Sequence, residues 1–323
     1  MAEFAHEYLR SAIASVAMLA TLSVAAAAQP SPKVRVGVLK VAGQTNAFAA
    51  QQQGFFKKRG LDVELIYIRS GSEGVSAMQG GSLDMIISIP SFGIVANERG
   101  LNLVVVLQNQ IAATTPPDSG AVLVAKDSSM RSPEELKDKV IGINALHAQE
   151  VVSAQHVIRK VGVTKDRIKY VEVPYAAMGD VLKRGDVAAV VAVEPFVTTI
   201  QQRGVGRVIA WAYHDAIPAQ PTGAYFAKRA WVEANLKSIE EYSAAIDEAN
   251  TYLLADHKRA RALVSQFTGL SPELVEAMPM IGWSTKVDPA KWAALIAMLK
   301  DEGELEKDQR LQDFMLPLMS IKR

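Results

Sequence analysis

The 323-residue sequence predicts an α/β fold in which strands and helices alternate. Runs rich in β-branched residues alternate with segments of helical periodicity up to about residue 211, and the connections between them are short. Such alternation is typical of parallel βαβ units. From Ser238 onward only helical patterns remain, so we expect a helical C-terminal region. The length is enough for two domains of ordinary size.

The segments expected to be strands are short and mostly apolar. They cover residues 34–39, 61–68, 83–87, 103–107, 121–125, 140–143, 168–173, 188–193 and 208–211. The segments expected to be helices are 46–59, a segment that Ser72 caps, 146–161 and 178–184. Three of these are expected to end at glycines, namely Gly60, Gly80–Gly81 and Gly162.

Helix starts are marked by capping residues. Capping boxes, in which a serine and a glutamate three residues later accept hydrogen bonds from each other's backbone N–H groups, are expected at 132–135 and 238–241. Ser271–Pro272 and Asp288–Pro289 are further predicted starts. After the last of them, Trp292, Leu295, Ile296 and Leu299 recur at helical spacing, and we expect them to pack against a sheet.

The composition excludes several classes of function. Lys plus Arg is 35 and Asp plus Glu is 34, so the molecule has no net field that would attract nucleic acid or an anionic membrane. There is no cysteine, which excludes disulfides, thiol catalysis, iron–sulfur clusters and thiolate zinc sites. It also excludes lipid attachment through an N-terminal cysteine. We expect no nucleic-acid partner.

The N-terminus has the pattern of an export signal over residues 1–28. Arg10 precedes an apolar, alanine-rich stretch at 12–28, and Ala26 and Ala28 supply a cleavage pattern before Gln29. The stretch is short for a membrane span. Acidic residues at positions 3 and 7 are unusual in a signal, so translation starting at Met18 is an alternative, and a disordered tail or a membrane anchor is another. We expect a cleaved signal peptide and a periplasmic protein.

Several segments resemble the nitrate/sulfonate/taurine-type substrate-binding proteins of ABC transporters, type II periplasmic binding proteins. The matching segments, in chain order, are Gly54–Leu65 (GFFKKRGLDVEL), Ser70–Ser72, Gly81–Asp84, Pro133–Ile143 (PEELKDKVIGI), the turn at Gly162, and Gly185–Ala189 leading to Val193–Phe196. Their order and spacing fit the family over about residues 33–211. The sequence departs from the family pattern at Ser88–Ser91 and Asn144–Ala148, both in loops expected to face the ligand.

The resemblance implies a two-lobed α/β fold, with a ligand cleft between the lobes. Lobe 1 would comprise residues 33–110 plus 213–323, and lobe 2 residues 111–212. Two extended crossings between the lobes would fall near 109–113 and 213–216. The implied partners are a small-molecule ligand and an ABC permease in the inner membrane, and we expect a monomer.

Candidate binding residues can be chosen without the family. Ligands of open parallel sheets bind beyond the carboxyl ends of the strands, and the loops 43–48, 70–74 and 144–148 lie at such ends before helices. Their backbone N–H groups and helix dipoles can hold an anion without arginine. Ser72 and Asn144 either cap their helices, contact the ligand, or do both.

Two carboxylates are candidates. Glu73 falls in the first turn of a helix, where a carboxylate is favoured by the dipole alone. Glu194 follows an apolar strand and precedes Pro195, so it projects into the cleft. It binds either an amino or amidine group of a ligand or a group of the opposite lobe.

The remaining candidates are aromatic or polar residues near strand ends. The aromatic residues near strand ends are Phe48, Phe92, Phe196, Trp211 and Tyr213; any one of them can be a core residue, but together they suggest a ligand with an apolar or planar part. Phe48 and Trp211 fall where cleft walls would be. His147 either donates to an anion at a helix N-terminus or has no further role. The complete ligand-binding set is Phe48, Ser72, Glu73, Ser91, Asn109, Asn144, His147, Glu194 and Trp211. We expect no metal, no cofactor and no catalytic residue, since the histidines lack metal spacing and no nucleotide-binding or nucleophile motif is present.

The predicted function is the capture of a small organic or anionic molecule outside the cytoplasm, by hinge closure, for an ABC importer. The alternatives are an enzyme on the same fold, such as a pyrimidine-precursor synthase or a dehydratase, and a ligand-sensing module. The synthases carry a Cys-rich motif that this chain lacks.

Overall fold

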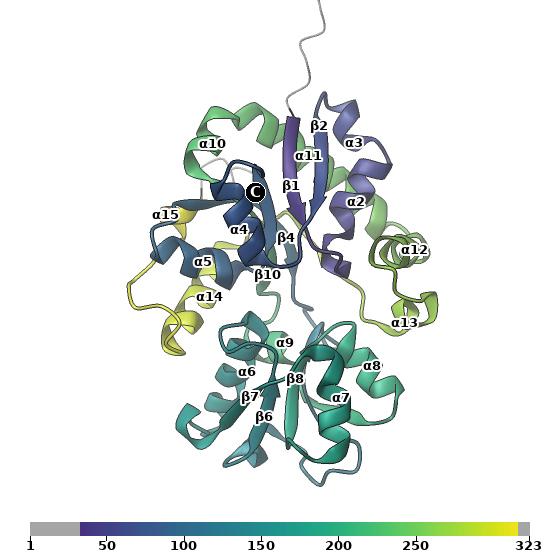
Figure 1. Cartoon of the computed structure of the whole chain (residues 1–323), viewed down its shortest axis with the longest axis vertical. Helices are drawn as coiled ribbons and strands as arrows, with labels where there is room; N and C mark the ends of the chain where they lie inside the picture. The colour runs from purple at the N-terminus through teal and green to yellow at the C-terminus, as the bar shows by residue number, and fades with distance from the viewer. Residues whose placement is uncertain (1–32, 316–323) are drawn as a thin grey trace, which may run out of the picture. The chain divides into compact units, whose positions relative to one another are not determined.

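The computed structural model describes residues 33–315, and the chain from Lys33 onward forms one compact unit. The predicted signal peptide at 1–28 lies outside the described residues. The described chain contains two separate β-sheets with helices beside them (Figure 1).

The first sheet has six strands in the order β11-β4-β10-β3-β1-β2. They are β1 (Lys33–Val38), β2 (Asp62–Tyr67), β3 (Met85–Ser88), β4 (Leu103–Ile111), β10 (Pro221–Lys228) and β11 (Gly282–Trp283). β2 and β3 both pair in parallel with β1, as the βαβ pattern predicts. β10 lies antiparallel between β3 and β4 and was not predicted.

The second sheet has five strands in the order β7-β6-β8-β5-β9. They are β5 (Gly120–Ala125), β6 (Val140–Ile143), β7 (Lys169–Glu172), β8 (Ala189–Val193) and β9 (Gly206–Ala210). β7 and β8 pair in parallel with β6, but β5 runs antiparallel to both β8 and β9. Both sheets are therefore mixed, with a parallel part built from the predicted βαβ units.

Helices are present at the segments predicted near 46–59, after Ser72, at 146–161 and 178–184, and in the C-terminal region, whereas those at 90–98, 196–202, 212–216 and 229–234 were not predicted. The helices are α2 (Thr45–Gln52), α3 (Phe55–Lys58), α4 (Gly71–Gln79), α5 (Pro90–Glu98), α6 (Gln149–Lys160), α7 (Tyr175–Arg184), α8 (Phe196–Gln202), α9 (Ala212–Ala216), α10 (Arg229–Ala234), α11 (Leu236–Leu254), α12 (His257–Thr268), α13 (Pro272–Ala277), α14 (Pro289–Asp301) and α15 (Leu311–Phe314). Short 3₁₀ turns are η1 (Ala42–Gln44), η2 (Pro133–Leu136) and η3 (Lys165–Arg167).

Two predictions about the early helices are wrong. The helix expected over 46–59 is split into α2 and α3, because Gly54 adopts a left-handed conformation with φ 73°. Ser72 does not cap α4. Ser70 is the N-cap, and its hydroxyl accepts a hydrogen bond from the backbone N of Glu73 at 3.2 Å.

The C-terminal region also differs in part. Ser238 is not a cap, since α11 already begins at Leu236, and the short strand β11 lies where only helices were expected. Ser271 and Asp288 do cap α13 and α14, as predicted. The predicted stripe on α14 is buried in one hydrophobic cluster with residues of β4 and β10, such as Val105 and Phe226, which confirms that it packs against a sheet.

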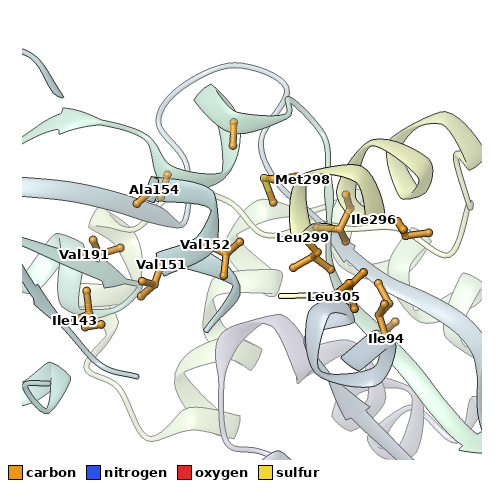
Figure 2. Close-up of a cluster of buried hydrophobic side chains, with 14 of the residues drawn as sticks. Ile94, Ile143, Val151, Val152, Ala154, Val191, Ile296, Met298, Leu299 and Leu305 are labelled. Atoms are coloured by element: carbon orange, nitrogen blue, oxygen red, sulfur yellow. The ribbon is translucent and has the colours of Figure 1, made fainter. Parts of the chain in front are cut away.

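One buried cluster joins elements beside the two sheets. Ile296, Met298 and Leu299 of α14 belong to the same apolar cluster as Val151 and Val152 of α6 (Figure 2). At the end of α14, Glu302 Oε1 accepts hydrogen bonds from Nε of Arg159 at 2.7 Å and from Nδ1 of His156 at 3.0 Å. The C-terminal helices are thus tied to α6 by both apolar packing and charge.

The chain passes between the sheets twice, at residues 112–119 and 211–220. The second passage contains the helix α9, so the predicted extended crossing at 213–216 is wrong. Asp118 links the two passages, because its carboxylate accepts from the backbone N of Ala113 at 3.1 Å and of His214 at 2.8 Å. Burial raises the pKa of this carboxyl group, while these backbone donors oppose the rise.

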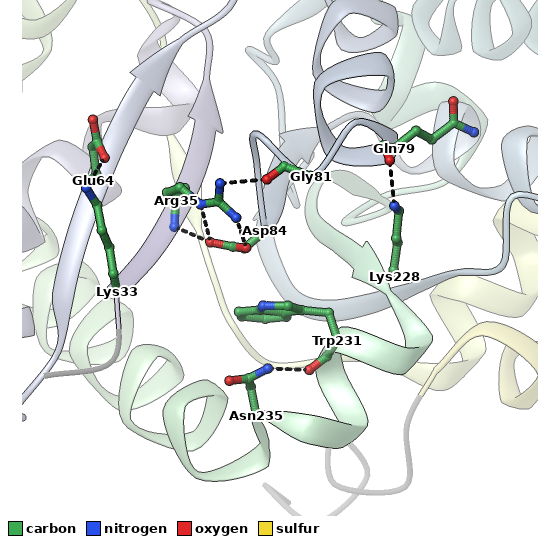
Figure 3. Close-up of polar contacts among 9 residues, drawn as sticks. All are labelled: Lys33, Arg35, Glu64, Gln79, Gly81, Asp84, Lys228, Trp231 and Asn235. Carbon is green, nitrogen blue, oxygen red and sulfur yellow. Dashed lines mark hydrogen bonds and ion pairs between the residues drawn. The ribbon is translucent and has the colours of Figure 1, made fainter. Parts of the chain in front are cut away.

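The segment Gly81–Asp84, one of those that resemble the family pattern, has a structural role at the end of the first sheet where β3 begins. The Asp84 carboxylate accepts from Arg35 Nε at 3.0 Å and Nη2 at 2.7 Å, and Arg35 Nη1 donates to the carbonyl of Gly81 at 2.6 Å (Figure 3). Asp84 is buried and Arg35 is partly buried. This bidentate pair fixes the start of β3 against β1.

Candidate functional site

A cavity of about 390 Å³ is lined by residues from both sheets. It lies at the carboxyl ends of strands: Leu39 follows β1, Ser88 ends β3, and Asn144 and Glu194 follow β6 and β8. This is the position that open α/β sheets offer to ligands, and the volume falls within the range of small-molecule sites.

The charged groups of the cavity are acidic. Among its lining residues in the described chain, Glu150 and Glu194 carry carboxylates, and there is no lysine, arginine or histidine. The nearby Lys40 lies over the ring of Tyr67, with its Nζ 4.8 Å from the ring centroid. The wall therefore offers negative charge and no cationic side chain.

Glu194 is delivered to the wall by the end of β8. Its backbone N donates to the carbonyl of Ser119 at 2.8 Å. Its carboxylate accepts from the hydroxyl of Thr198 at 2.8 Å and from the backbone N of the same residue at 3.2 Å. Burial raises the pKa of Glu194 to about 7, although these two hydrogen bonds favour the charged form.

Glu150 is the second carboxylate of the wall; it is buried on the first turn of α6, whereas Glu194 is partly buried. The hydroxyl of Tyr175 donates to its Oε1, and the hydroxyl of Tyr213 lies 3.4 Å from its Oε2. Burial raises the pKa of Glu150 above its ordinary value, and the two tyrosine hydrogen bonds oppose the rise. The pKa values of both tyrosines are raised as well, first because they are buried and then because of the Glu150 charge.

Two amides in the cavity wall are already committed to the protein. Gln44 Oε1 accepts from the backbone N of Leu39 at 2.7 Å, and its Nε2 donates to the carbonyl of Ile87 at 3.3 Å. Asn109 accepts from Asn46 Nδ2 and donates to the carbonyl of Gly43, both at 2.9 Å. These residues shape the wall by fixing loop backbone, and their hydrogen-bonding groups are largely used.

Gly120 allows Tyr213 to reach its place in the wall. A methyl group at Gly120 would lie 2.8 Å from Cδ2 and Cε2 of the Tyr213 ring, closer than real side chains approach. The hydroxyl of Tyr213 is one of the two that face Glu150. The absence of a side chain at position 120 therefore lets the Tyr213 ring lie in the cavity wall.

Four of the nine sequence-predicted residues line the cavity, namely Ser72, Asn109, Asn144 and Glu194. The structure brings them together from the first turn of α4, from β4, and from the residues that directly follow β6 and β8. The other five do not line it.

Each of these five has other contacts. Phe48 stacks obliquely against Phe267 of α12, with ring centroids 5.2 Å apart. Glu73 pairs with Arg69 at 3.2 Å. Ser91 is buried, and its backbone N donates to Gln149 Oε1 at 3.1 Å. His147 Nδ1 lies 2.6 Å from Glu304 Oε2. The backbone N of Trp211 donates to Asp215 at 2.8 Å, and its side chain packs beside the apolar cluster of the second sheet.

The sequence analysis missed Glu150 and Tyr175. Glu150 has the ordinary pattern of an acidic residue in a helix's first turn, and Tyr175 begins α7 directly after Pro174. The two residues are 25 positions apart in the sequence, so only the folded structure shows that their side chains are hydrogen-bonded.

Residues 33–315 contain no cluster of three or more His, Cys, Asp or Glu side chains that could hold a metal ion. In the same range no helix has both the length and the apolar character needed to cross a bilayer.

The fold is that of the periplasmic binding proteins, as predicted. The aliphatic sulphonate-binding protein SsuA of Escherichia coli is similar with a TM-score of 0.75 and 18% identity, covering 87% of this chain and 96% of its own. SsuA of Xanthomonas axonopodis, bound to MOPS, has a TM-score of 0.72 and 19% identity, and the match covers 90% of this chain and 99% of that protein. The nitrate-binding protein NrtA of Synechocystis has a TM-score of 0.64 and 13% identity, and the match covers 86% of this chain and 83% of that protein.

The chain belongs to the NMT1-like family, whose model matches residues 27–268. This confirms the family resemblance seen in the sequence. Among curated proteins, YtlA of Bacillus subtilis, whose name proposes a binding role, is 21% identical over 274 residues, which is 80% of each chain.

Proposed function

We propose that this protein is an extracytoplasmic solute-binding protein that captures a small molecule and delivers it to an ABC permease. The observation that carries the proposal is the cavity itself, which is lined by residues from two separate sheets. The similar proteins SsuA, NrtA and YtlA are each named as binding proteins, which supports a binding role.

The proposed mechanism is hinge closure of two lobes around the ligand. We propose that lobe 1 comprises residues 33–110 plus 213–323 and lobe 2 residues 111–212, because the two sheets divide along these boundaries. A ligand that contacts Ser72 from one lobe and Glu194 from the other would favour the closed state by its differential contacts. Asp118, which holds the two passages together, would lie at the hinge.

An enzyme on the same fold is the second candidate, and one observation favours it. Two carboxylates with raised pKa values facing one cavity are groups that general acid–base catalysis uses. A binding protein returns its ligand unchanged, whereas an enzyme converts it over many turnovers. Mass spectrometry of the ligand after prolonged incubation with the protein separates the two.

Transport can be tested in the source cells. Deleting the gene should abolish high-affinity uptake of the ligand, and the exported protein should begin near Gln29 on N-terminal sequencing. We expect a monomer in the periplasm. Uptake that is unchanged by the deletion, or protein recovered from the cytoplasm with Met1 intact, would contradict the proposal.

A further inference from the structure

We infer that the ligand carries a cationic N–H donor group, such as an ammonium, an amidinium or a protonated aminoheterocycle, held by Glu194 and Glu150. This inference rests on the proposed function and names the class of solute. It differs from the sulphonate and nitrate named for the structural neighbours.

The first step is the charge balance of the cavity. Neither Glu150 nor Glu194 has an ion-pair partner among residues 33–315, and no cationic side chain lines the wall there. A buried carboxylate without a counter-charge is costly. A cationic ligand supplies that charge, whereas an anion would add repulsion to it.

The second step is the hydrogen-bonding capacity that remains open. A carboxylate accepts at about four positions, and Glu194 receives its two side-chain hydrogen bonds from Thr198 alone. The hydroxyl of Tyr175 spends its proton on Glu150, so it presents a lone pair to further partners. Thr222 Oγ1, also in the cavity wall, is buried without a partner. The Thr222 hydroxyl can accept or donate, whereas the free positions on Glu194 and on the Tyr175 oxygen can only accept, so these two groups call for a donor on the ligand.

The N-termini of four helices also act on the cavity. α4, α5, α6 and α7 each contribute residues of their first turn or N-cap to its wall, and each N-terminus is equivalent to about half a positive charge. One of their donors is already used, because the backbone N of Ser91 donates to Gln149. The dipole of α6 already acts on the protein's own Glu150, which lies in its first turn, and no cationic side chain in the described wall adds to the other dipoles.

The aromatic residues complete a site for a planar or alkyl-substituted cation. Tyr175 lines the cavity and stacks on Phe196 with centroids 5.3 Å apart, and Phe92 of α5 contributes a second ring. Ring faces attract cations and bury the apolar part of an organic ligand. A volume of about 390 Å³ limits the ligand to a small molecule.

The test uses probes of one shape and three charges. Benzamidine, benzamide and benzoate are titrated into the exported protein by calorimetry at pH 8, together with 4-aminopyridine, taurine and nitrate. We expect at least one cation to bind, and benzoate, taurine and nitrate to bind at least tenfold more weakly than that cation. The variant Glu194→Gln should weaken cation binding about 10- to 150-fold, the range for hydrogen bonds to charged groups. Glu73→Gln, on the Arg69 pair outside the cavity, is the matched control and should leave affinity unchanged.

The outcomes are distinguishable. Tighter binding of an anion than of every cation, or no loss of cation affinity in a folded Glu194→Gln variant, would overturn the cationic assignment and leave solute capture intact. Loss of cation affinity in Glu73→Gln equal to that in Glu194→Gln would also overturn it. Chemical conversion of the bound molecule would instead contradict the proposed function.

Discussion

The contact between α14 and α6 makes a stability prediction that can be worked out from the structure. Glu302 is buried, and its Oε1 accepts from Arg159 and His156. The change Glu302→Gln keeps the shape and removes the charge. Hydrogen bonds to charged groups contribute about 1.5–3 kcal/mol, but the Arg159 side chain is 41% exposed and its share is screened by solvent.

We therefore expect Glu302→Gln to lower the free energy of unfolding by about 1–2 kcal/mol. For a chain of this size that corresponds to a fall in Tm of about 2–4 °C. Urea denaturation at pH 7, followed by tryptophan fluorescence, measures the difference. Ligand affinity should change less than about threefold, because Glu302 does not line the cavity.

The matched control is Asp301→Asn. Asp301 lies 3.5 Å from the same arginine, but its side chain is 59% exposed, so a loss below about 0.5 kcal/mol is expected. If the two variants lose the same stability, the buried carboxylate does not tie α14 to α6 and the reasoning is refuted.

Three further predictions concern the site and its support. Because burial raises the pKa of Glu194 to about 7 and a cation binds the charged form, cation affinity should fall about tenfold per pH unit below 7; calorimetry from pH 5 to 8 should show this, and a flat profile would contradict it. Asp84→Asn should lower the free energy of unfolding by about 2–4 kcal/mol in urea denaturation, because it breaks a mostly buried bidentate pair with Arg35. Glu64→Gln, in an exposed pair with Lys33, should lower it by less than about 0.5 kcal/mol. Equal losses in the two variants would contradict a stabilising role for the buried pair. Gly120→Ala should weaken ligand binding by displacing Tyr213, and wild-type affinity in that variant would show that the ring tolerates the methyl group.

Local sequence patterns predicted the parallel strands of both sheets. The runs at 34–39 and 140–143 are apolar and β-branched, and they became β1 and β6 with parallel neighbours. β10 was missed because its residues Pro221, Thr222 and Gly223 interrupt the strand pattern, and its antiparallel place between β3 and β4 comes from the chain's return to the first sheet.

The candidate site was predicted where it depends on strand ends. Glu194 and Asn144 follow predicted strands, and both line the cavity. Phe48 does not, because the return of the C-terminal helices places Phe267 against it. Glu150 was not predicted, because its tyrosine partners come from α7 and α9, and no local sequence pattern shows that these residues are in contact.

Native mass spectrometry of the protein isolated from the periplasm tests the central claim most directly. Desorption should show a fraction of the protein carrying one small molecule in a one-to-one complex, released chemically unchanged and bearing a basic nitrogen, and this bound fraction should be absent from Glu194→Gln. Protein that carries no small molecule even from cells grown on the transported solute, or that releases a converted product, would contradict solute capture. An intact anionic ligand would leave capture standing and contradict the cationic site.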